Sequence, residues 1–297
     1  MHGHSLTIIE ELKKEFDLLK GRKESLLTLL EESELPESVY NSNAIENSTL
    51  TLDETEKILI HQELPSHHSK REVFEAINLG AVTQYLAEKI RQKKSLDEEL
   101  LLFIHQSLLS HISDTIAGRF RQKNEFVRVG SHIAPAPEKI PAMMAKTLMD
   151  YHGEGHPLDR IISFHLAFEH AHPFCDGNGR VGRALLNFQL KSHGYPPVII
   201  RNKEKKDYYD ALRAYDNDRS VKHFEHIIAP LLKESLHKRI TYLRDDEVLL
   251  LSKLIKGQSQ HSPQSVLNSA KKQSLPAFRE RGRWKVGKKM FGEWMAA

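Results

Sequence analysis

The sequence has little cysteine, no long apolar run and no excess of one charge. Cys175 is the only cysteine among 297 residues, so a disulfide within the chain is excluded. No apolar run approaches the ~20 residues that span a bilayer, and the first residues lack the basic segment and apolar run of a secretory leader. The chain has 43 Lys and Arg against 40 Asp and Glu, and this near balance does not favour nucleic acid as the partner of the whole chain. These absences predict a cytoplasmic protein without a membrane partner.

The apolar residues that are present recur at spacings of three and four, which is the pattern of amphipathic helices. Extended alternating runs are scarce, so we expect an all-α fold with its core centred on residues 161–166 and 185–190. Asp53 and Glu56 resemble a capping box at one helix start, and Pro36 is expected to end the first helical region. The expected helical segments are residues 5–32, as one helix or a broken pair, 53–65, 71–92, 96–109, 157–169 and 180–194.

Two stretches depart from the helical pattern. In residues 118–137, Phe126, Val127 and Val129 are flanked by turn residues, which predicts a short β-hairpin. Residues 257–275 are rich in Gln, Ser and Lys, which indicates a boundary beyond Leu236. We therefore divide the chain into an N-terminal helical region (1–95), a core (96–236) and a C-terminal module (237–297).

Residues 172–183 read His-Pro-Phe-Cys-Asp-Gly-Asn-Gly-Arg-Val-Gly-Arg and open a predicted helix. Gly177, Asn178 and Gly179 allow consecutive backbone N–H groups to converge on an anion. The helix N-terminus adds its dipole, and Arg180 and Arg183 lie on neighbouring positions of the first turn. This loop therefore suits a polyphosphate.

Two other side chains of the loop can take part in chemistry. Asp176 offers the oxygen ligand that Mg²⁺ uses together with substrate phosphates. His172 is the one side chain of the run that accepts a proton near neutral pH. Taken singly, each feature is more often a turn or a structural histidine. Their joint occurrence favours transfer of a nucleotide phosphate to a hydroxyl.

The whole run resembles the signature of the Fic family: His-Pro-Phe, any residue, Asp or Glu, Gly-Asn-Gly-Arg, two residues, Arg. The resemblance implies a Fic-type helical core that transfers AMP from ATP to a Tyr, Ser or Thr hydroxyl of a target protein or of the chain itself. It implies His172 as the catalytic base and Asp176 as the Mg²⁺ ligand. Family members often dimerise, so a second copy is a further expected partner. The loop residues expected to contact the nucleotide are Phe174, Asp176, Gly177, Asn178, Gly179, Arg180 and, at the γ-phosphate, Arg183.

The resemblance extends to two further segments. The predicted hairpin resembles the Fic flap, which aligns the target by main-chain pairing; the alternative is an ordinary surface hairpin. Tyr208 and Tyr209 resemble the segment that packs on adenine. Asp216 stands where some relatives have Asn, which leaves its nucleotide contact open. The flap residues expected along the nucleotide are Val127, Arg128, Val129 and Gly130.

Residues 42–47, Ser-Asn-Ala-Ile-Glu-Asn, resemble the inhibitory motif of Fic proteins whose inhibitory helix precedes the core. The resemblance implies that Glu46 pairs with Arg183, because a carboxylate and a guanidinium form a strong, directional contact. ATP would then bind only in a non-productive pose. Alternatively, Glu46 activates water and the enzyme removes AMP, and the sequence does not assign the direction.

The C-terminal segment is basic and aromatic. Residues 275–279 and 282–286 resemble the winged end of small excisionase-like helix-turn-helix modules. Two interpretations stay open: a DNA-contacting module of a regulator whose core only senses nucleotide, or a small helical and β-ribbon appendage whose aromatics pack on the core and whose charges are solvated. The residues concerned are Arg279, Arg281, Arg283, Lys285, Lys288 and Lys289, with Phe278, Trp284, Phe291 and Trp294 between them.

Overall fold

Helices dominate the structure, a computed structural model that describes residues 3–21, 23–64, 67–130, 132–256 and 261–296. The chain forms two compact units. The first comprises residues 1–34, 195–198 and 226–297, and the second comprises residues 35–194 and 199–225. Helices α2 (Glu24–Ile45) and α10 (Lys222–Leu243) contribute residues to both. Helix α10 runs through residue 236, and the division into three segments stays a prediction.

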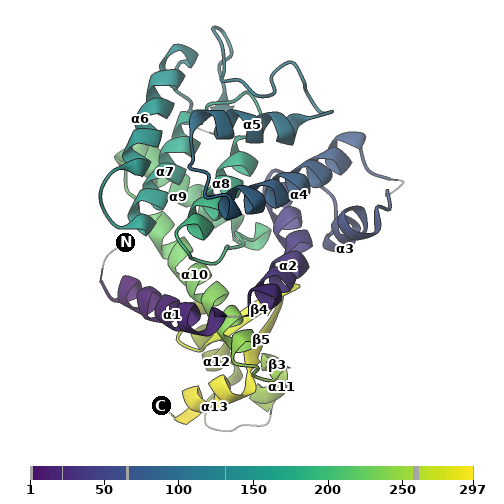
Figure 1. Ribbon diagram of the computed structural model, residues 1–297, viewed down its shortest axis with the longest axis vertical. Coiled ribbons are helices and arrows are strands. Elements are labelled where there is room, and N and C mark those ends of the chain that lie inside the picture. The colour runs from purple at the N-terminus through teal and green to yellow at the C-terminus, as the bar shows by residue number, and fades with distance from the viewer. Residues whose placement is uncertain (1–2, 22, 65–66, 131, 257–260, 297) are drawn as a thin grey trace. The chain divides into compact units, whose positions relative to one another are not determined.

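Helices make up most of the second unit (Figure 1). It also contains one short hairpin. Helix α7 packs between α6 and α8, and its first residue is Pro157, as predicted. The apolar residues of 161–166 and 185–190 are at most 2% exposed, which confirms the expected centre of the core. The elements are α3 (Leu52–Glu56), the π-helix η1 (Lys57–His61), α4 (Lys70–Arg91), α5 (Glu98–Leu109), the 3₁₀-helix η2 (Pro137–Lys139), α6 (Ile140–His152), α7 (Pro157–Ala171), α8 (Asn178–Ser192), the 3₁₀-helix η3 (Asn202–Glu204) and α9 (Lys205–Asp218).

The predicted hairpin is present within residues 118–137. Strand β1 (Arg128–Val129) pairs antiparallel with β2 (His132–Ile133), so that Val129 lies opposite His132. At the open end of the hairpin, where Val127 precedes β1 and Ala134 follows β2, the Ala134 N–H donates to the Val127 carbonyl at 3.1 Å. The side chains of Phe126 and Ile133 are 64% and 71% exposed.

The expected start of the helix at Asp53 is wrong. Thr51, not Asp53, caps α3, because its hydroxyl accepts from the Glu54 N–H while the Glu54 carboxylate accepts from the Thr51 N–H at 2.8 Å. Helix α3 then passes into the π-helix η1, and Pro65, the expected end, lies outside the described residues.

Pro36 does not end the first helical region. It lies inside α2, which continues to Ile45. A proline inside a helix costs about 3 kcal/mol. The turns that follow bury Val39, Ala44 and Ile45 at 5% exposure or less, and each buried aliphatic side chain of the size of valine or isoleucine contributes about 1.5–3 kcal/mol. Burial therefore outweighs the missing hydrogen bond.

The first unit contains a small sheet besides its helices. Helix α1 (His4–Lys20) and the start of α2 form the broken pair expected for residues 5–32. The strands are antiparallel in the order β3-β5-β4, and the apolar core beside them includes Val266, Leu275 and Val286. In the part of the chain that the structure describes, no helix is both long and apolar enough to cross a membrane. The remaining elements are β3 (Val248–Leu250), α11 (Leu251–Lys256), α12 (Pro263–Lys272), β4 (Ala277–Glu280), β5 (Arg283–Gly287) and α13 (Lys288–Ala296).

Candidate active site

A cleft of about 800 Å³ in the second unit brings together all the predicted site residues except Phe174. Phe174 is completely buried, and its ring stacks on His105 with ring centroids 3.7 Å apart, so it supports the loop from the core. The residues that line the cleft are His172, Asp176, Gly177, Asn178, Gly179, Arg180 and Arg183 from the loop and α8; Val127, Arg128, Val129 and Gly130 from the hairpin; Tyr208 and Tyr209 from α9; and Glu46.

The glycine-rich loop turns into α8 at Gly177. This residue has φ 79°, a left-handed conformation that glycine adopts without strain, and α8 begins at Asn178, two residues earlier than predicted. The Asn178 side chain accepts from the Phe174 N–H and donates to the Phe174 carbonyl, each at 2.9 Å. Because the Asn178 amide is used to close the loop, the groups that could bind an anion here are the backbone N–H groups at the start of α8.

The orientation of His172 leaves one ring nitrogen able to accept a proton. Its main chain ends α7 in a left-handed conformation with φ 47°, and its Nδ1 lies 3.3 Å from the Glu169 carbonyl. A carbonyl only accepts, so Nδ1 carries the hydrogen and Nε2 keeps a lone pair. Burial lowers the pKa of His172 to about 4. The imidazole is therefore neutral at neutral pH and able to accept a proton at Nε2.

Asp176 is held between arginines at the mouth of the loop. It contacts the Arg71 guanidinium, accepts from the Gly177 N–H at 2.6 Å, and lies 3.4 Å from Arg180 Nη2. Burial alone would raise the pKa of Asp176, but the Arg180 and Arg71 charges keep it below its ordinary value. One ionised carboxylate beside a phosphate loop is the donor that Mg²⁺ uses together with substrate phosphates, so the site fits this ion.

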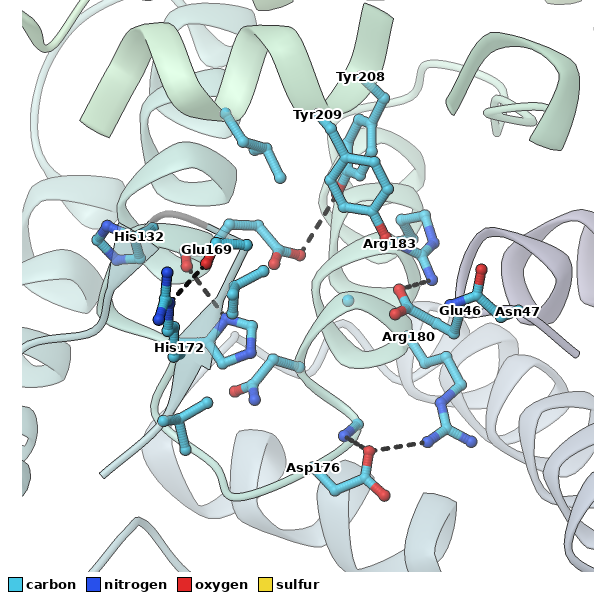
Figure 2. A pocket seen from close by; sticks show the side chains of 18 of the residues that line it. Glu46, Asn47, His132, Glu169, His172, Asp176, Arg180, Arg183, Tyr208 and Tyr209 are labelled. Atoms are coloured by element: carbon cyan, nitrogen blue, oxygen red, sulfur yellow. Dashed lines mark hydrogen bonds and ion pairs between the residues drawn. The ribbon is translucent and has the colours of Figure 1, made fainter. Parts of the chain in front are cut away.

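The Glu46 carboxylate forms an ion pair with the guanidinium of Arg183 (Figure 2). Arg183 Nη2 donates to Glu46 Oε1 and to the Ser42 carbonyl, both at 2.8 Å, and Nε donates to the Ser42 hydroxyl at 3.0 Å. The Arg183 side chain is 7% exposed and the Glu46 side chain is 36% exposed, so the guanidinium is buried while the carboxylate is partly open to water. The serine and the glutamate of the motif at residues 42–47 thus bind the same guanidinium.

Two backbone features make room for this ion pair. A Cβ atom at Gly179 would lie 2.1 Å from Glu46 Oε1, so only glycine lets the carboxylate approach α8 here. Asn47 follows with φ 70°, a left-handed conformation that asparagine tolerates better than most residues. The chain therefore reverses directly after Glu46.

Glu169 is a buried carboxyl of the cleft that the sequence reasoning missed. Burial lowers the pKa of His165 to about 3, and His165 Nδ1 lies 3.2 Å from the Gly182 carbonyl, so Nε2 accepts from the Tyr208 hydroxyl at 3.0 Å. The Tyr208 oxygen also lies 3.4 Å from Glu169 Oε1. Burial raises the pKa of Glu169 to about 7, so this carboxyl keeps its proton to a higher pH than an exposed glutamate does.

This proton makes stability depend on pH. The pKa of Glu169 is raised from 4.5 to about 7 in the folded chain, so the contribution is fully present below about pH 4.5 and is lost as the pH rises through 7. Relative to Glu169→Gln, we expect the free energy of unfolding of the unmodified protein to fall by about 2–3 kcal/mol between about pH 5 and pH 8. Urea unfolding at both pH values measures this. The exposed Glu154→Gln should keep the original pH dependence, and the same dependence in Glu169→Gln would contradict the assignment.

Arg121 is a second residue that the sequence reasoning missed. It is 3% exposed, and its guanidinium donates to the His172 carbonyl at 2.8 Å and to the Ala171 carbonyl at 3.2 Å. It also donates to the carbonyls of Glu125 and Pro135, at 3.0 and 2.9 Å. One side chain thus joins the main chain at the end of α7 to both ends of the hairpin. Arg71, Glu75 and His105 complete the set of supporting residues that no sequence signal pointed to.

Comparisons with known proteins agree with this geometry. The model of the Fic/DOC family matches residues 95–190. Protein adenylyltransferase Fic of Drosophila willistoni is 30% identical over 250 residues, which are 82% of this chain and 49% of the fly protein. The chain spans about half the length of the curated relatives that it matches.

Solved structures share the fold. A Fic domain containing signaling protein from Bacteroides thetaiotaomicron superposes with a TM-score of 0.72 at 23% identity, covering 80% of this chain and 97% of that one. A Fic family protein from Desulfovibrio desulfuricans gives 0.66 at 23% identity, covering 97% of each chain. Residues 95–190 therefore form a domain of the Fic/DOC family.

Proposed function

We propose that this protein transfers AMP from ATP to a hydroxyl group of a protein, and that Glu46 restrains the reaction. The observation that carries the proposal is a neutral His172 with a free Nε2, in one cleft with a helix N-terminus, Asp176 and Arg183. A base beside an anion site is the arrangement that phosphoryl transfer to a hydroxyl requires. The curated relatives named protein adenylyltransferase support this direction.

The reaction follows from these positions. His172 Nε2 takes the hydroxyl proton while the hydroxyl oxygen bonds to the α-phosphorus of ATP. The bond from that phosphorus to the bridging oxygen breaks, and pyrophosphate leaves. The N–H groups at the start of α8 and Arg183 offset the phosphate charge. Asp176 would hold Mg²⁺, whose charge adds to this stabilisation.

The hairpin suits a protein substrate. In the described residues β1 pairs with β2 alone, so its other edge has main-chain groups for an added strand. Phe126 and Ile133 expose apolar side chains next to these strands. We expect a target segment carrying Tyr, Ser or Thr to pair there, on another protein or on a second copy of this chain.

The proposal is tested by intact-protein mass spectrometry of Glu46→Gly incubated with ATP and MgCl₂. We expect an added AMP on a Tyr, Ser or Thr of the protein, and no addition when EDTA replaces MgCl₂. The reverse direction has its own signature: the unmodified sequence, but not Glu46→Gly, would remove AMP from premodified protein. The proposal is overturned if the protein neither adds AMP nor removes it.

DNA contact by the C-terminal module is a second candidate, supported by the polar face of α12. The order β3, α11, α12, β4, β5 places two helices before a hairpin, as in winged helix-turn-helix modules. The turn between β4 and β5 exposes Arg281 and Arg283. Three of the cations considered from the sequence instead form ion pairs: Arg279 with Glu234, Lys285 with Glu280, and Lys288 with Glu247. The exposed residues of α12 are Pro263, Gln264, Ser265, Asn268, Lys271 and Lys272.

A filter-binding assay with nonspecific duplex at low salt tests this candidate. We expect retention of the duplex that falls with added salt, because each lysine–phosphate contact releases a counterion. Replacing Lys271 and Lys272 by glutamine should weaken retention and reduce the salt slope by about 2. Glutamines at the ion-paired Lys285 and Lys288 serve as the matched control. No retention at low salt would leave the module as a structural appendage.

A further inference from the structure

Three potential metal ligands from three different elements meet on one side of the cleft: His132 on β2, His170 on α7 and Asp216 on α9. Their donor atoms all lie within 4.8 Å of one another. His170 Nδ1 is 2.7 Å from Asp216 Oδ1, and His132 Nδ1 is 3.3 Å from Asp216 Oδ2. The three side chains are only 14–16% exposed. Figure 2 shows His132 on the same side of the cleft as His172, but the proposed reaction uses none of the three.

The hydrogen of His132 is fixed by its surroundings. His132 Nε2 lies 3.0 Å from the main-chain carbonyl of His170, which can only accept, so Nε2 carries the hydrogen. In the neutral ring, Nδ1 then has a lone pair. This lone pair faces an oxygen of Asp216, a second acceptor. Two acceptors at 3.3 Å repel one another, and a metal ion bound by both would remove this repulsion.

We propose that His132, His170 and Asp216 form a site for a divalent transition-metal ion of the kind of Zn²⁺. Two imidazole nitrogens and one carboxylate oxygen are a ligand set that Zn²⁺ prefers, whereas Mg²⁺ prefers oxygen alone. The Nε2–H of His132 on a backbone carbonyl is the outer contact that zinc-binding histidines usually make. Three protein ligands leave a fourth position open. This site differs from the one at Asp176 in residues and in chemistry.

Arg219 opposes the metal ion and therefore sets its affinity. Arg219 Nη2 lies 3.0 Å from His170 Nε2, and a guanidinium only donates, so Nε2 accepts and Nδ1 points its hydrogen at Asp216. Burial lowers the pKa of His170, in agreement with a neutral ring. Binding through Nδ1 moves this hydrogen to Nε2, and Arg219 has to turn away. Arg219 is exposed and follows the last residue of α9, where its guanidinium can reach water.

The bound ion would fix the hairpin to the helical core. His132 belongs to β2, whereas His170 and Asp216 belong to α7 and α9. A metal ion bound to all three therefore restrains the strand that pairs with β1. Amide hydrogen exchange of the hairpin should slow when the metal binds, whether or not the protein transfers AMP.

Calorimetric titration of the metal-free full chain with ZnCl₂ tests the site. Because the chain has 18 histidines, the readout is the difference between variants. We expect Asp216→Asn to bind one equivalent of Zn²⁺ less than the unmodified protein. His132→Gln should show the same loss of one equivalent. His223→Asn, which changes an exposed histidine of the same unit, should bind as many equivalents as the unmodified protein.

Arg219→Gln gives an effect of the opposite sign. The oxygen of the new glutamine can accept from His170 Nε2–H. We therefore expect the Arg219→Gln variant to bind as many equivalents of Zn²⁺ as the unmodified protein, with about tenfold higher affinity at this site, which is the size of effect that contacts to metal ligands have. Co²⁺ in place of Zn²⁺ should give the visible absorption of a nitrogen- and oxygen-ligated ion, absent in Asp216→Asn. Equal stoichiometry in the unmodified protein and Asp216→Asn would overturn the site. These readouts do not depend on AMP transfer, so either proposal can fail alone.

Discussion

Replacing Glu46 by glycine should raise the rate of AMP self-modification by about 10- to 100-fold. Hydrogen bonds to charged groups contribute about 1.5–3 kcal/mol, and about 1.4 kcal/mol corresponds to a factor of ten. The substitution removes the 2.8 Å contact to Arg183 Nη2. Both contacts of Arg183 with Ser42 remain, so the guanidinium stays in place and becomes available to the γ-phosphate. Incorporation of labelled AMP, measured as an initial rate, gives the ratio.

Two further variants separate the ion pair from other effects of a glycine. Glu46→Gln keeps the shape of the side chain but removes its charge, so the rate should rise, though less than in Glu46→Gly. Glu154→Gly places the same substitution in an exposed turn of the same unit and should leave the rate unchanged. An unchanged or lower rate in Glu46→Gly would contradict the proposed restraint.

The loop residues could be predicted because their chemistry is local. The base, the carboxylate, the glycines and the arginines follow one another along the chain, and the start of α8 brings them into one cleft. Glu46 could be predicted only because Ser42 and Asn47 stand at fixed spacings from it in the motif of residues 42–47. The structure gives that spacing a reason: Ser42 and Glu46 bind one guanidinium, and Asn47 takes the left-handed turn.

The supporting residues could not be predicted, because long-range packing decides them. Arg71 contacts Asp176 across 105 positions of sequence, and Arg121 reaches His172 across 51. Neither residue belongs to a local pattern. Glu169 stands three residues before His172, yet only its burial in the folded chain raises its pKa to about 7. Phe174 is the opposite case: its place in the loop predicts a nucleotide contact, but the ring packs in the core.

The helix errors have the same origin. The cost of Pro36 is a local property, whereas the burial of the residues after it depends on their partners in the folded chain. For α3, two overlapping capping patterns compete, Thr51 with Glu54 and Asp53 with Glu56. Only the structure shows which of the two forms both hydrogen bonds.

Replacing His172 should abolish AMP transfer while ATP binding stays within about threefold of the unmodified protein. General base catalysis contributes about 10²–10⁴-fold, and no other loop side chain can take the proton. The contacts that shape the loop use the main chain of residue 172, whose N–H donates to the Phe168 carbonyl and whose carbonyl accepts from Arg121. Removing the imidazole therefore leaves the phosphate site intact.

The choice of substitution matters because residue 172 has φ 47°. His172→Ala puts a residue with little tendency for the left-handed region at this position, whereas asparagine enters that region readily and has no basic group. We therefore expect both variants, made in the Glu46→Gly protein, to lose transfer, and His172→Asn to bind ATP at least as well as His172→Ala. Mass spectrometry measures the transfer and calorimetry the binding. Transfer retained in His172→Asn would remove the base from the mechanism, whereas loss of both transfer and binding in that variant would mean that the imidazole also shapes the nucleotide site.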